Sequence, residues 1–256
     1  MFHALVAGAV GAPWTVRPWL ADIEALNERA LSATPLAITK LSVHGLGHLT
    51  GRYAALQVGA ALGRGCGPLV VARDARALND VRGRVAVPGR FTTAHLLLRI
   101  FGPPGLEVVH MRFEKILPAV AAGEVDAGVI IHEGRFVYGG FGLAMVADLG
   151  AVWEADTGLP LPLGVIAAAR GLAQADVFED RLRASIAAAW ADPTASAAFV
   201  RAHAQELDPE VCRRHIALYV NEYSSGLGDE GRAAVETLLR RGAEVGMLPR
   251  DARPWR

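Results

Sequence analysis

The stretch GEVDAGVIIHEGRF, residues 123–136, decides how the middle of this chain folds. Residues 125–131 form a short apolar run rich in β-branched side chains, which predicts a buried strand. The run ends abruptly at His132, where a polar segment begins. Ligands of open α/β sheets gather beyond the carboxyl ends of the strands, so a titratable histidine at this position is a candidate site residue. The same histidine would serve equally well to close the strand by hydrogen-bonding a backbone carbonyl.

The composition indicates a globular protein with a substantial core. Of the 256 residues, 52% are hydrophobic and 20% are charged, which excludes a disordered chain and leaves room for one large domain or two smaller ones. Lys+Arg and Asp+Glu number 26 each, so we expect no surface for nucleic acid or for an anionic membrane. The sequence carries no signal for an oligomeric state.

Three features favour a cytoplasmic protein. No apolar run is long enough to span a bilayer. No Lys or Arg precedes the apolar residues 2–12, as it would in a secretory signal. The two cysteines, Cys66 and Cys212, form no CxxC motif and are interpreted as small buried side chains in a reducing compartment.

Strand and helix patterns alternate from residue 74 onward. Strands are predicted at 85–87, 108–112, 125–131 and 144–148, and helices from residue 92 or 93 and over 114–122. Earlier segments predict helices at 2–10 and 23–31, the second capped by Asp22, and strands at 16–20, 36–39 and 53–58. After residue 171 every pattern is helical, over 177–190, 193–204, 209–219 and 231–245. Parallel strands joined by helices are the natural interpretation of the alternating part.

Two similar strand patterns divide the chain into lobes. GPLVVARD at residues 67–74 and LPLPLGVIAAARG at 159–171 bracket the alternating region, and each is interpreted as carrying the chain between lobes. We expect these two crossover strands to lie side by side. The lobes are then residues 1–72 with 160–256, and residues 73–159.

Two other motifs suggest sites that we do not favour. Residues 59–67 hold four glycines but neither GxGxxG nor a GKS/T ending, so a close-packed or flexible loop is favoured over a phosphate cradle. His44 and His48 lie four residues apart, but glycines intervene and the glutamate of a zinc protease is absent, so no metal site is predicted. His95 is expected to pack on the flank of its helix.

Hydroxyl residues recur where predicted strands turn into helices. Ser42 occupies such a position in the first lobe, and Thr92 and Thr93 occupy one in the second. Helix N-termini present unpaired N–H groups and a partial positive charge, so two of them facing across a cleft would hold a carboxylate or phosphate. The alternative is that each hydroxyl only caps its helix, which is the commoner role of Ser and Thr there.

Five segments carry a resemblance to a known family. They are KLSVHGLGHLTGRYAALQVGAALGRGCGPLVV (40–71), VAVPGRFTTAHLLL (85–98), ILPAVAAGEVDAGVIIHEGRF (116–136), TGLPLPLGVIAA (157–168) and HAQELDPEVCRRHIALYVNEYS (203–224). From about residue 2 to residue 245, the sequence resembles the 1,4-dihydroxy-6-naphthoate synthases of the futalosine pathway to menaquinone.

The resemblance implies an α/β, two-lobed fold similar to the type II periplasmic binding proteins, with two crossover strands. It implies a carbon–carbon lyase that splits cyclic dehypoxanthinyl futalosine into 1,4-dihydroxy-6-naphthoate and a sugar-derived dione, with no metal or organic cofactor. It also implies that His132 is the catalytic base or nucleophile and that Ser42 and Thr92 contact the ligand. Thr93 and Arg90 flank the second of these positions and complete the predicted substrate-binding set.

The chain departs from the family pattern at its beginning. Family members start with a strand and a Ser-Pro-Cys-Pro-Asn-Asp segment ahead of the first helix, whereas this sequence starts inside that helix. The resemblance therefore predicts a strand ahead of Met1. That strand would fill a gap between the strands predicted at 16–20 and 36–39.

Other functions and roles remain open on sequence grounds. The alternatives are the chorismate dehydratase of the same pathway, a solute-binding protein without catalysis, and a relative that has lost its activity. Arg90 and Arg135 are candidates for pairing with a substrate carboxylate, although ordinary ion pairs explain them equally well. Asn221 and Tyr223 are expected near the region between the lobes, without an assigned role.

Overall fold

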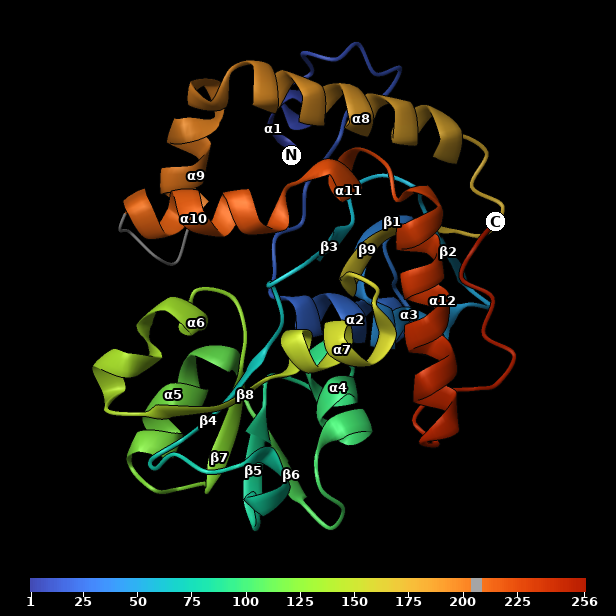
Figure 1. Cartoon of the computed structure of the whole chain (residues 1–256). Coiled ribbons are helices and arrows are strands. Elements are labelled where there is room, and N and C mark those ends of the chain that lie inside the picture. Colours follow the sequence, from blue (N-terminus) through green and yellow to red (C-terminus); the bar gives the residue numbers. More distant parts are fainter. Residues whose placement is uncertain (204–208) are drawn as a thin grey trace.

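The computed structural model describes residues 1–203 and 209–256, which form two β-sheets surrounded by helices (Figure 1). The first sheet consists of β1 (Ile38–Ser42), β2 (Tyr53–Ala55), β3 (Ala61–Gly63) and β9 (Leu161–Ala169). The second has the order β6-β5-β7-β4-β8 and consists of β4 (Leu69–Ala72), β5 (Arg84–Val87), β6 (Glu107–His110), β7 (Ala127–Ile130) and β8 (Ala144–Asp148).

The helices lie outside and between the sheets. They are α1 (His3–Val6), α2 (Ile23–Leu31), α3 (Val43–Leu49), α4 (Thr93–Phe101), α5 (Phe113–Ala121), α6 (Gly134–Val137), α7 (Leu149–Thr157), α8 (Ala175–Ala191), α9 (Ala197–His203), α10 (Pro209–Tyr219), α11 (Glu222–Ser225) and α12 (Gly228–Glu244). Short 3₁₀ turns occur at Leu78–Asp80, Tyr138–Phe141 and Pro193–Ser196. No helix in the described ranges is both long and apolar enough to cross a bilayer.

Several predicted elements appear where their local chemistry places them. α2 begins after Asp22, whose carboxylate accepts a hydrogen bond from Ala25 N at 3.0 Å, as the predicted cap requires. β8 and α10 have the predicted bounds. The helix predicted over 193–204 appears as a 3₁₀ turn followed by α9, and residue 204 lies outside the described residues.

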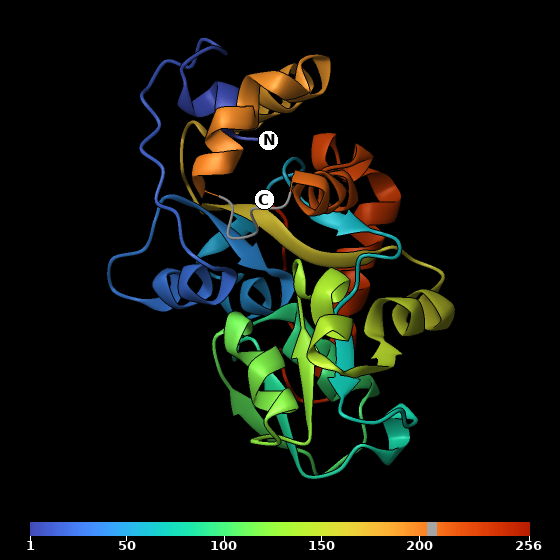
Figure 2. The same cartoon turned by 90° about the vertical axis from the view of Figure 1, so that its left-hand side faces the viewer.

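β9 is the strand around which the first sheet is built. It pairs antiparallel with β1 along one edge, where Ser42 lies opposite Gly164, and with β2 and β3 along the other. Figure 2 shows β9 as a long yellow strand that crosses the molecule above the green second sheet. The glycine-rich stretch 59–67, interpreted from sequence as a loop, supplies β3 to this arrangement.

The second sheet mixes strand directions. β5 runs parallel to β6 and β7, as the alternating strand and helix pattern predicts. β4 runs antiparallel to both β7 and β8. The prediction of parallel strands concerns the part of the chain after residue 74, and β4 lies ahead of it as one of the two predicted crossover strands. Because β4 is antiparallel to both β7 and β8, those two strands run in the same direction.

The strand pairings bear on two expectations, the neighbourhood of the two crossover segments and the boundary between the lobes. Among the described pairings the two crossover segments are not hydrogen-bonded to each other, because β4 pairs within the second sheet and β9 pairs within the first. β4 also falls in the first lobe of the predicted division at residue 72, although its hydrogen bonds join it to the second sheet. The division into lobes stays a prediction, and the pairing of β4 favours a boundary closer to Gly67.

The strand predicted at residues 16–20 does not form. This segment is irregular, with Trp19 and Leu20 exposed by 43% and 59%, and Pro18 cannot donate to a strand ladder. Among the described pairings β1 bonds only to β9, and its other edge faces a groove of about 610 Å³. Apolar residues from 14–20 and 36–40 line this groove on two sides.

The hydrophobic core does not stop at the border between the sheets. The largest buried cluster contains Leu41 and Val165 from the first sheet and Val70 and Val129 from the second. Trp153 of α7 is fully buried in the same cluster, and its indole N–H donates to Pro160 O at 3.1 Å. The two sheets therefore share packing through the helices between them.

Gly67 and Gly150 bring the start of β4 against the start of α7. A Cβ on Gly150 would lie 2.7 Å from the Cα of Gly67, which is closer than carbon atoms approach. We expect Gly150→Ala to lower the free energy of unfolding by about 1–3 kcal/mol, the usual cost of overpacking. Urea unfolding followed by tryptophan fluorescence measures this loss.

Gly139 supplies the matched control for that substitution. It is exposed and a Cβ built on it meets nothing within 4 Å. Gly139→Ala should therefore change the free energy of unfolding by less than about 0.5 kcal/mol. Equal stability of the two variants would contradict the close approach of the two backbones.

Candidate functional site

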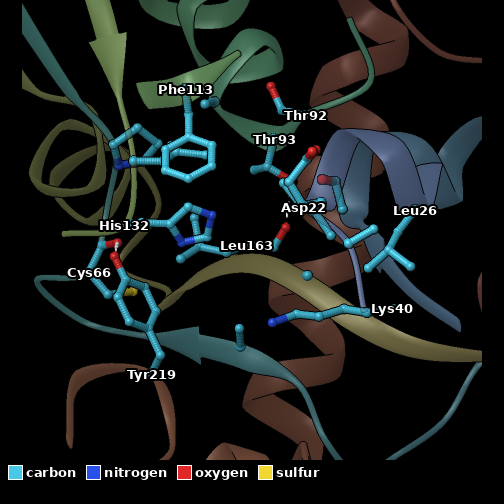
Figure 3. A pocket seen from close by; sticks show the side chains of 18 of the residues that line it. Asp22, Leu26, Lys40, Cys66, Thr92, Thr93, Phe113, His132, Leu163 and Tyr219 are labelled. Atoms are coloured by element: carbon cyan, nitrogen blue, oxygen red, sulfur yellow. Dashed lines mark hydrogen bonds between the residues drawn. The ribbon is translucent and has the colours of Figure 1, made fainter. Parts of the chain in front are cut away.

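A cleft of about 700 Å³ opens between the two sheets and gathers residues that are distant in the sequence (Figure 3). Its lining comes from strands of the first sheet, from segments next to the strands of the second, from neighbouring helices and from the C-terminal helical region. The lining residues that the following argument uses are Asp22, Leu26, Lys40, Ser42, Cys66, Thr92, Thr93, Ala94, Arg112, Phe113, His132, Leu163, Gly164 and Tyr219. A cleft of this size accommodates an ordinary small-molecule substrate.

His132 projects from the end of β7 into this cleft. Its φ of 56° is positive, and no other non-glycine residue in the described ranges has a positive φ. The left-handed conformation costs a side-chain-bearing residue about 1 kcal/mol and is retained mainly where the surrounding structure enforces it. The ring of Phe113 packs edge-on against the imidazole, with ring centroids 5.2 Å apart and an interplanar angle of 74°. The predicted catalytic histidine is thus a strained residue on the wall of the cleft.

The three predicted hydroxyl residues all line the cleft, but their hydroxyl groups have different hydrogen-bond partners. Thr92 caps α4: its Oγ1 accepts from His95 N at 3.2 Å and donates to Gly89 O at 3.0 Å. Thr93 Oγ1 donates to Leu163 O at 2.7 Å. Ser42 makes no cap bond to α3, so the capping alternative holds for Thr92 and not for Ser42.

Asn27 ties the cleft residues of the two sheets together. Its amide oxygen accepts from Ser42 N at 3.0 Å, and its amide nitrogen donates to Ser42 Oγ at 3.1 Å and to Phe91 O at 3.3 Å. Glu24, one turn earlier on α2, accepts from Phe91 N at 2.9 Å. Asn27 is fully buried, so these bonds replace water completely. One helix of the first lobe therefore fixes both Ser42 and the turn ahead of Thr92.

Two glycines leave the space that this network occupies. A Cβ on Gly45 would lie 2.7 Å from Asn27 Oδ1, and one on Gly89 would lie 2.4 Å from Glu24 Cδ. Gly89 also has a φ of 156°, which favours glycine. The local sequence around Ser42 and Thr92 thus fits the side chains of α2, although nothing within either segment reveals it.

Four histidines, His48, His44, His95 and His110, form a row of neighbouring imidazoles next to the turn ahead of α4. His44 Nδ1 donates to Thr92 O at 3.1 Å, and His95 Nδ1 donates to Arg90 O at 2.9 Å. Because a carbonyl only accepts, both rings carry their proton on Nδ1 and are neutral acceptors at Nε2. His48 Nε2 then donates to His44 Nε2 at 3.4 Å, and Arg99 Nε donates to His95 Nε2 at 3.3 Å. His95 therefore does more than pack on the flank of its helix.

The predicted cations do not contact the cleft as expected. Arg90 is exposed and is not part of the lining, and its guanidinium lies over the ring of Phe91 at 5.5 Å. Arg135 pairs with Asp148 at 3.1 Å and donates to Gly67 O at 2.8 Å. Arg90 as a substrate-binding residue stays a prediction, and it does not line the cleft as the structure describes it.

The two residues expected between the lobes also lie outside the cleft. Asn221 caps α11 by accepting from Tyr223 N at 3.1 Å, and it donates to Leu62 O at 2.9 Å. Tyr223 bonds to Glu230. Both therefore have structural roles in the C-terminal region.

Sequence reasoning missed four residues of this site. Lys40, Phe113 and Tyr219 line the cleft, and Asn27 organises it. Lys40 had a usable signal, since alternation along a strand places it on the same face as Ser42. Phe113, Tyr219 and Asn27 lie on helices whose cleft-facing side only the assembled fold defines.

Comparison with known proteins identifies the family. A family model described as menaquinone biosynthesis matches residues 1–244. The 1,4-dihydroxy-6-naphthoate synthase of Thermus thermophilus is 47% identical over 99% of this chain and 93% of that protein. The synthase of Streptomyces coelicolor is also 47% identical, over 97% of this chain and 90% of that protein. The chain belongs to the 1,4-dihydroxy-6-naphthoate synthase family of menaquinone biosynthesis. It is an enzyme acting on a small-molecule pathway intermediate, as the family resemblance predicts.

Solved structures confirm the fold class. A protein of Archaeoglobus fulgidus has a TM-score of 0.89 and 36% identity, covering 96% of this chain and 93% of its own. The alkanesulfonate-binding protein SsuA of Xanthomonas axonopodis pv. citri has a TM-score of 0.70 and 18% identity, covering 96% of this chain and 88% of its own. The second likeness concerns the fold alone. The synthase family thus uses the α/β fold of the type II periplasmic binding proteins here, as predicted.

Burial controls the protonation of the imidazole row in this family member. It lowers the pKa of His44 from 6.5 to about 3 and the pKa of His95 from 6.5 to about 4, against the opposing effect of their carbonyl partners. Burial also lowers the pKa of His48 and His110, which lie at the exposed ends of the row. The row is neutral at physiological pH.

Stability should therefore fall in acid. The pKa values of His44 and His95 are lower in the folded than in the unfolded chain, so between pH 6.5 and about 4 the unfolded chain binds more protons. Each histidine then lowers the free energy of unfolding by about 1.4 kcal/mol per pH unit as the pH falls. Urea unfolding at pH 7, 6 and 5 measures the slope. His44→Gln should make it shallower by one proton, and an unchanged slope would contradict the neutral assignment.

Removing the Asn27 amide should destabilise the fold and loosen the cleft. Asn27→Ala leaves the Ser42 N–H and the Phe91 carbonyl without their partner, which costs about 2 kcal/mol or more when such groups are buried. We expect a lower urea midpoint together with a raised KM. Asn79→Ala, at an exposed asparagine, is the control and should stay within about 0.5 kcal/mol. Normal stability of Asn27→Ala would contradict this role.

Proposed function

We propose that this enzyme splits cyclic dehypoxanthinyl futalosine into 1,4-dihydroxy-6-naphthoate and a sugar-derived dione, with His132 as the group that accepts a proton from the substrate. The observation that supports this most directly is the position of His132. His132 follows the end of a buried strand, has a positive φ of 56° and lines the cleft. Strained backbone of this kind gathers at sites where a side chain must be held in one direction.

The walls around His132 suit a flat, ring-containing substrate. Phe113, Leu163 and Leu26 contribute apolar surface, and Tyr219 adds a second ring below His132 in the view of Figure 3. Apolar walls exclude water and so strengthen every electrostatic interaction inside the cleft. In such surroundings an imidazole that is positioned to accept a proton contributes about 10²–10⁴-fold to the rate.

Donors on the opposite wall are available for the oxygen that gains electron density as the bond breaks. The hydroxyl of Ser42 accepts from Asn27 Nδ2 at 3.1 Å, which leaves its own proton for a ligand. The N–H groups of Thr93 and Ala94 open α4 and have no acceptor in the described ranges, as expected for the first turn of a helix. The hydroxyls of Thr92 and Thr93 donate their protons to backbone carbonyls, so toward a ligand they can only accept hydrogen bonds. In this proposal, Ser42 is the hydroxyl that donates.

The remaining expectations follow from the same assignment. The substrate carries a carboxylate, the reaction is a carbon–carbon lyase reaction, and the protein works in the cytoplasm. In this proposal His132 and the donors around it carry out the proton transfer, and the family resemblance implies no cofactor.

Two replacements of His132 separate its chemical role from its backbone conformation. His132→Ala and His132→Gly both remove the imidazole, so both should lower kcat by at least about 100-fold while KM changes little. Glycine adopts a positive φ without strain, so His132→Gly should be more stable than His132→Ala by about 1 kcal/mol. Steady-state formation of 1,4-dihydroxy-6-naphthoate and urea unfolding provide the two measurements.

The outcomes of this experiment are distinct. Near-normal kcat in either variant would show that His132 only closes its strand. If the wild-type enzyme does not convert cyclic dehypoxanthinyl futalosine but dehydrates chorismate, the proposed reaction is wrong. The protein is then the chorismate dehydratase of the same pathway. Equal stability of the two variants would show that the backbone at residue 132 is not strained.

A further inference from the structure

Lys40 places a positive charge inside the cleft. It lies on β1 two residues before Ser42, and its half-buried side chain is part of the cleft lining. In Figure 3 its ammonium group points into the cleft, toward the side that carries His132 and Tyr219. Gly164 on the neighbouring strand lies beside the stem, since a Cβ there would be in ordinary van der Waals contact with Lys40 Cε at 3.7 Å.

The ammonium group has no partner within the described part of the chain. No carboxylate lies within ion-pair distance of Lys40 Nζ, and no acceptor lies within hydrogen-bond distance. The other cationic side chains near the cleft are occupied. Arg112, also in the lining, pairs with Glu114, and Arg135 pairs with Asp148. Lys40 is therefore the cation of the lining that is left for a ligand.

The composition of the chain makes this position unusual. Of its 26 cationic residues only two are lysines, Lys40 and Lys115. Lys115 is exposed on α5 outside the cleft, so the single lysine in the interior of this arginine-rich protein faces the proposed substrate. A lysine is a compact point charge on a flexible stem, which suits a carboxylate approached along one direction.

The surroundings of Lys40 add an energetic reason. Burial lowers the pKa of its ammonium group, because the cleft removes water that would otherwise solvate the charge. A partly desolvated charge without a partner is unfavourable, and a bound carboxylate would offset that cost.

We propose that Lys40 binds the carboxylate of the naphthoate ring and so orients the reacting part of the substrate toward His132. This assignment rests on the proposed function, since it takes the carboxylated ring as the ligand. Lys40 is preferred here to Arg90, which does not line the cleft, and to Arg135, which is already paired with Asp148. The ring system then lies between a charge on the first sheet and a base on the second.

Binding of the product tests this without turnover. The probes are 1,4-dihydroxy-6-naphthoate and its neutral 6-carboxamide, kept under nitrogen, and calorimetry or tryptophan quenching gives Kd for each. Wild-type enzyme should bind the carboxylate at least tenfold more tightly than the amide. Lys40→Met and Lys40→Gln should both lose this preference by weakening carboxylate binding and leaving amide binding unchanged. Lys115→Met is the matched control and should keep the preference.

The results separate this proposal from the proposed reaction. Variants of Lys40 that melt like the wild type and keep the tenfold preference would overturn the role of Lys40, even if the lyase activity is confirmed. Loss of the preference in both variants would support the role of Lys40, even if the wild-type enzyme proved inactive on cyclic dehypoxanthinyl futalosine. Wild-type enzyme that does not discriminate the two probes would also overturn it. Lys40→Gln serves as the second replacement if Lys40→Met does not fold.

Discussion

The side chain of Asn27 holds three segments that are distant in the sequence in fixed positions relative to one another. It connects α2 to the start of α3 through Ser42 and to the turn ahead of α4 through Phe91. Glu24 adds the bond to Phe91 N, and Gly45 and Gly89 leave the space for both side chains. Because the amide is fully buried, each bond it fails to make would leave a polar group without water. The positions of Ser42 and Thr92 on the cleft wall depend on this constraint.

The two sheets are less independent than a two-lobed outline suggests. β9 bonds to three strands of the first sheet, and the largest buried cluster continues from Leu41 and Val165 into Val70 and Val129 of the second. Trp153 fills the core between them, and the row of imidazoles packs behind the turn at Arg90. Rigid packing on this side of the cleft leaves the substrate facing fixed groups, which is what a preorganised site requires.

Local patterns were sufficient for most elements and for the central histidine. The apolar run before His132 defines β7, and Asp22 and Thr92 mark the starts of α2 and α4 by the hydrogen bonds that their side chains accept. The strand predicted at 16–20 failed because apolar residues next to a proline do not by themselves supply a partner strand. The predicted neighbours β4 and β9 belong to different sheets, since similar apolar runs do not specify which strand they pair with.

The sequence by itself determined the family, the fold class, most of the strands and helices, and the placement of His132 after a buried strand. These follow from periodicity, capping and long motifs, which are properties of neighbouring residues. Only the tertiary structure decided that Arg135 is paired, that Lys40 lines the cleft and that Asn27 organises it. The direction of a long charged side chain, and the partner of a buried amide, depend on groups brought together from distant parts of the chain. No local pattern contains that information, because burial and hydrogen-bond satisfaction are properties of the assembled fold.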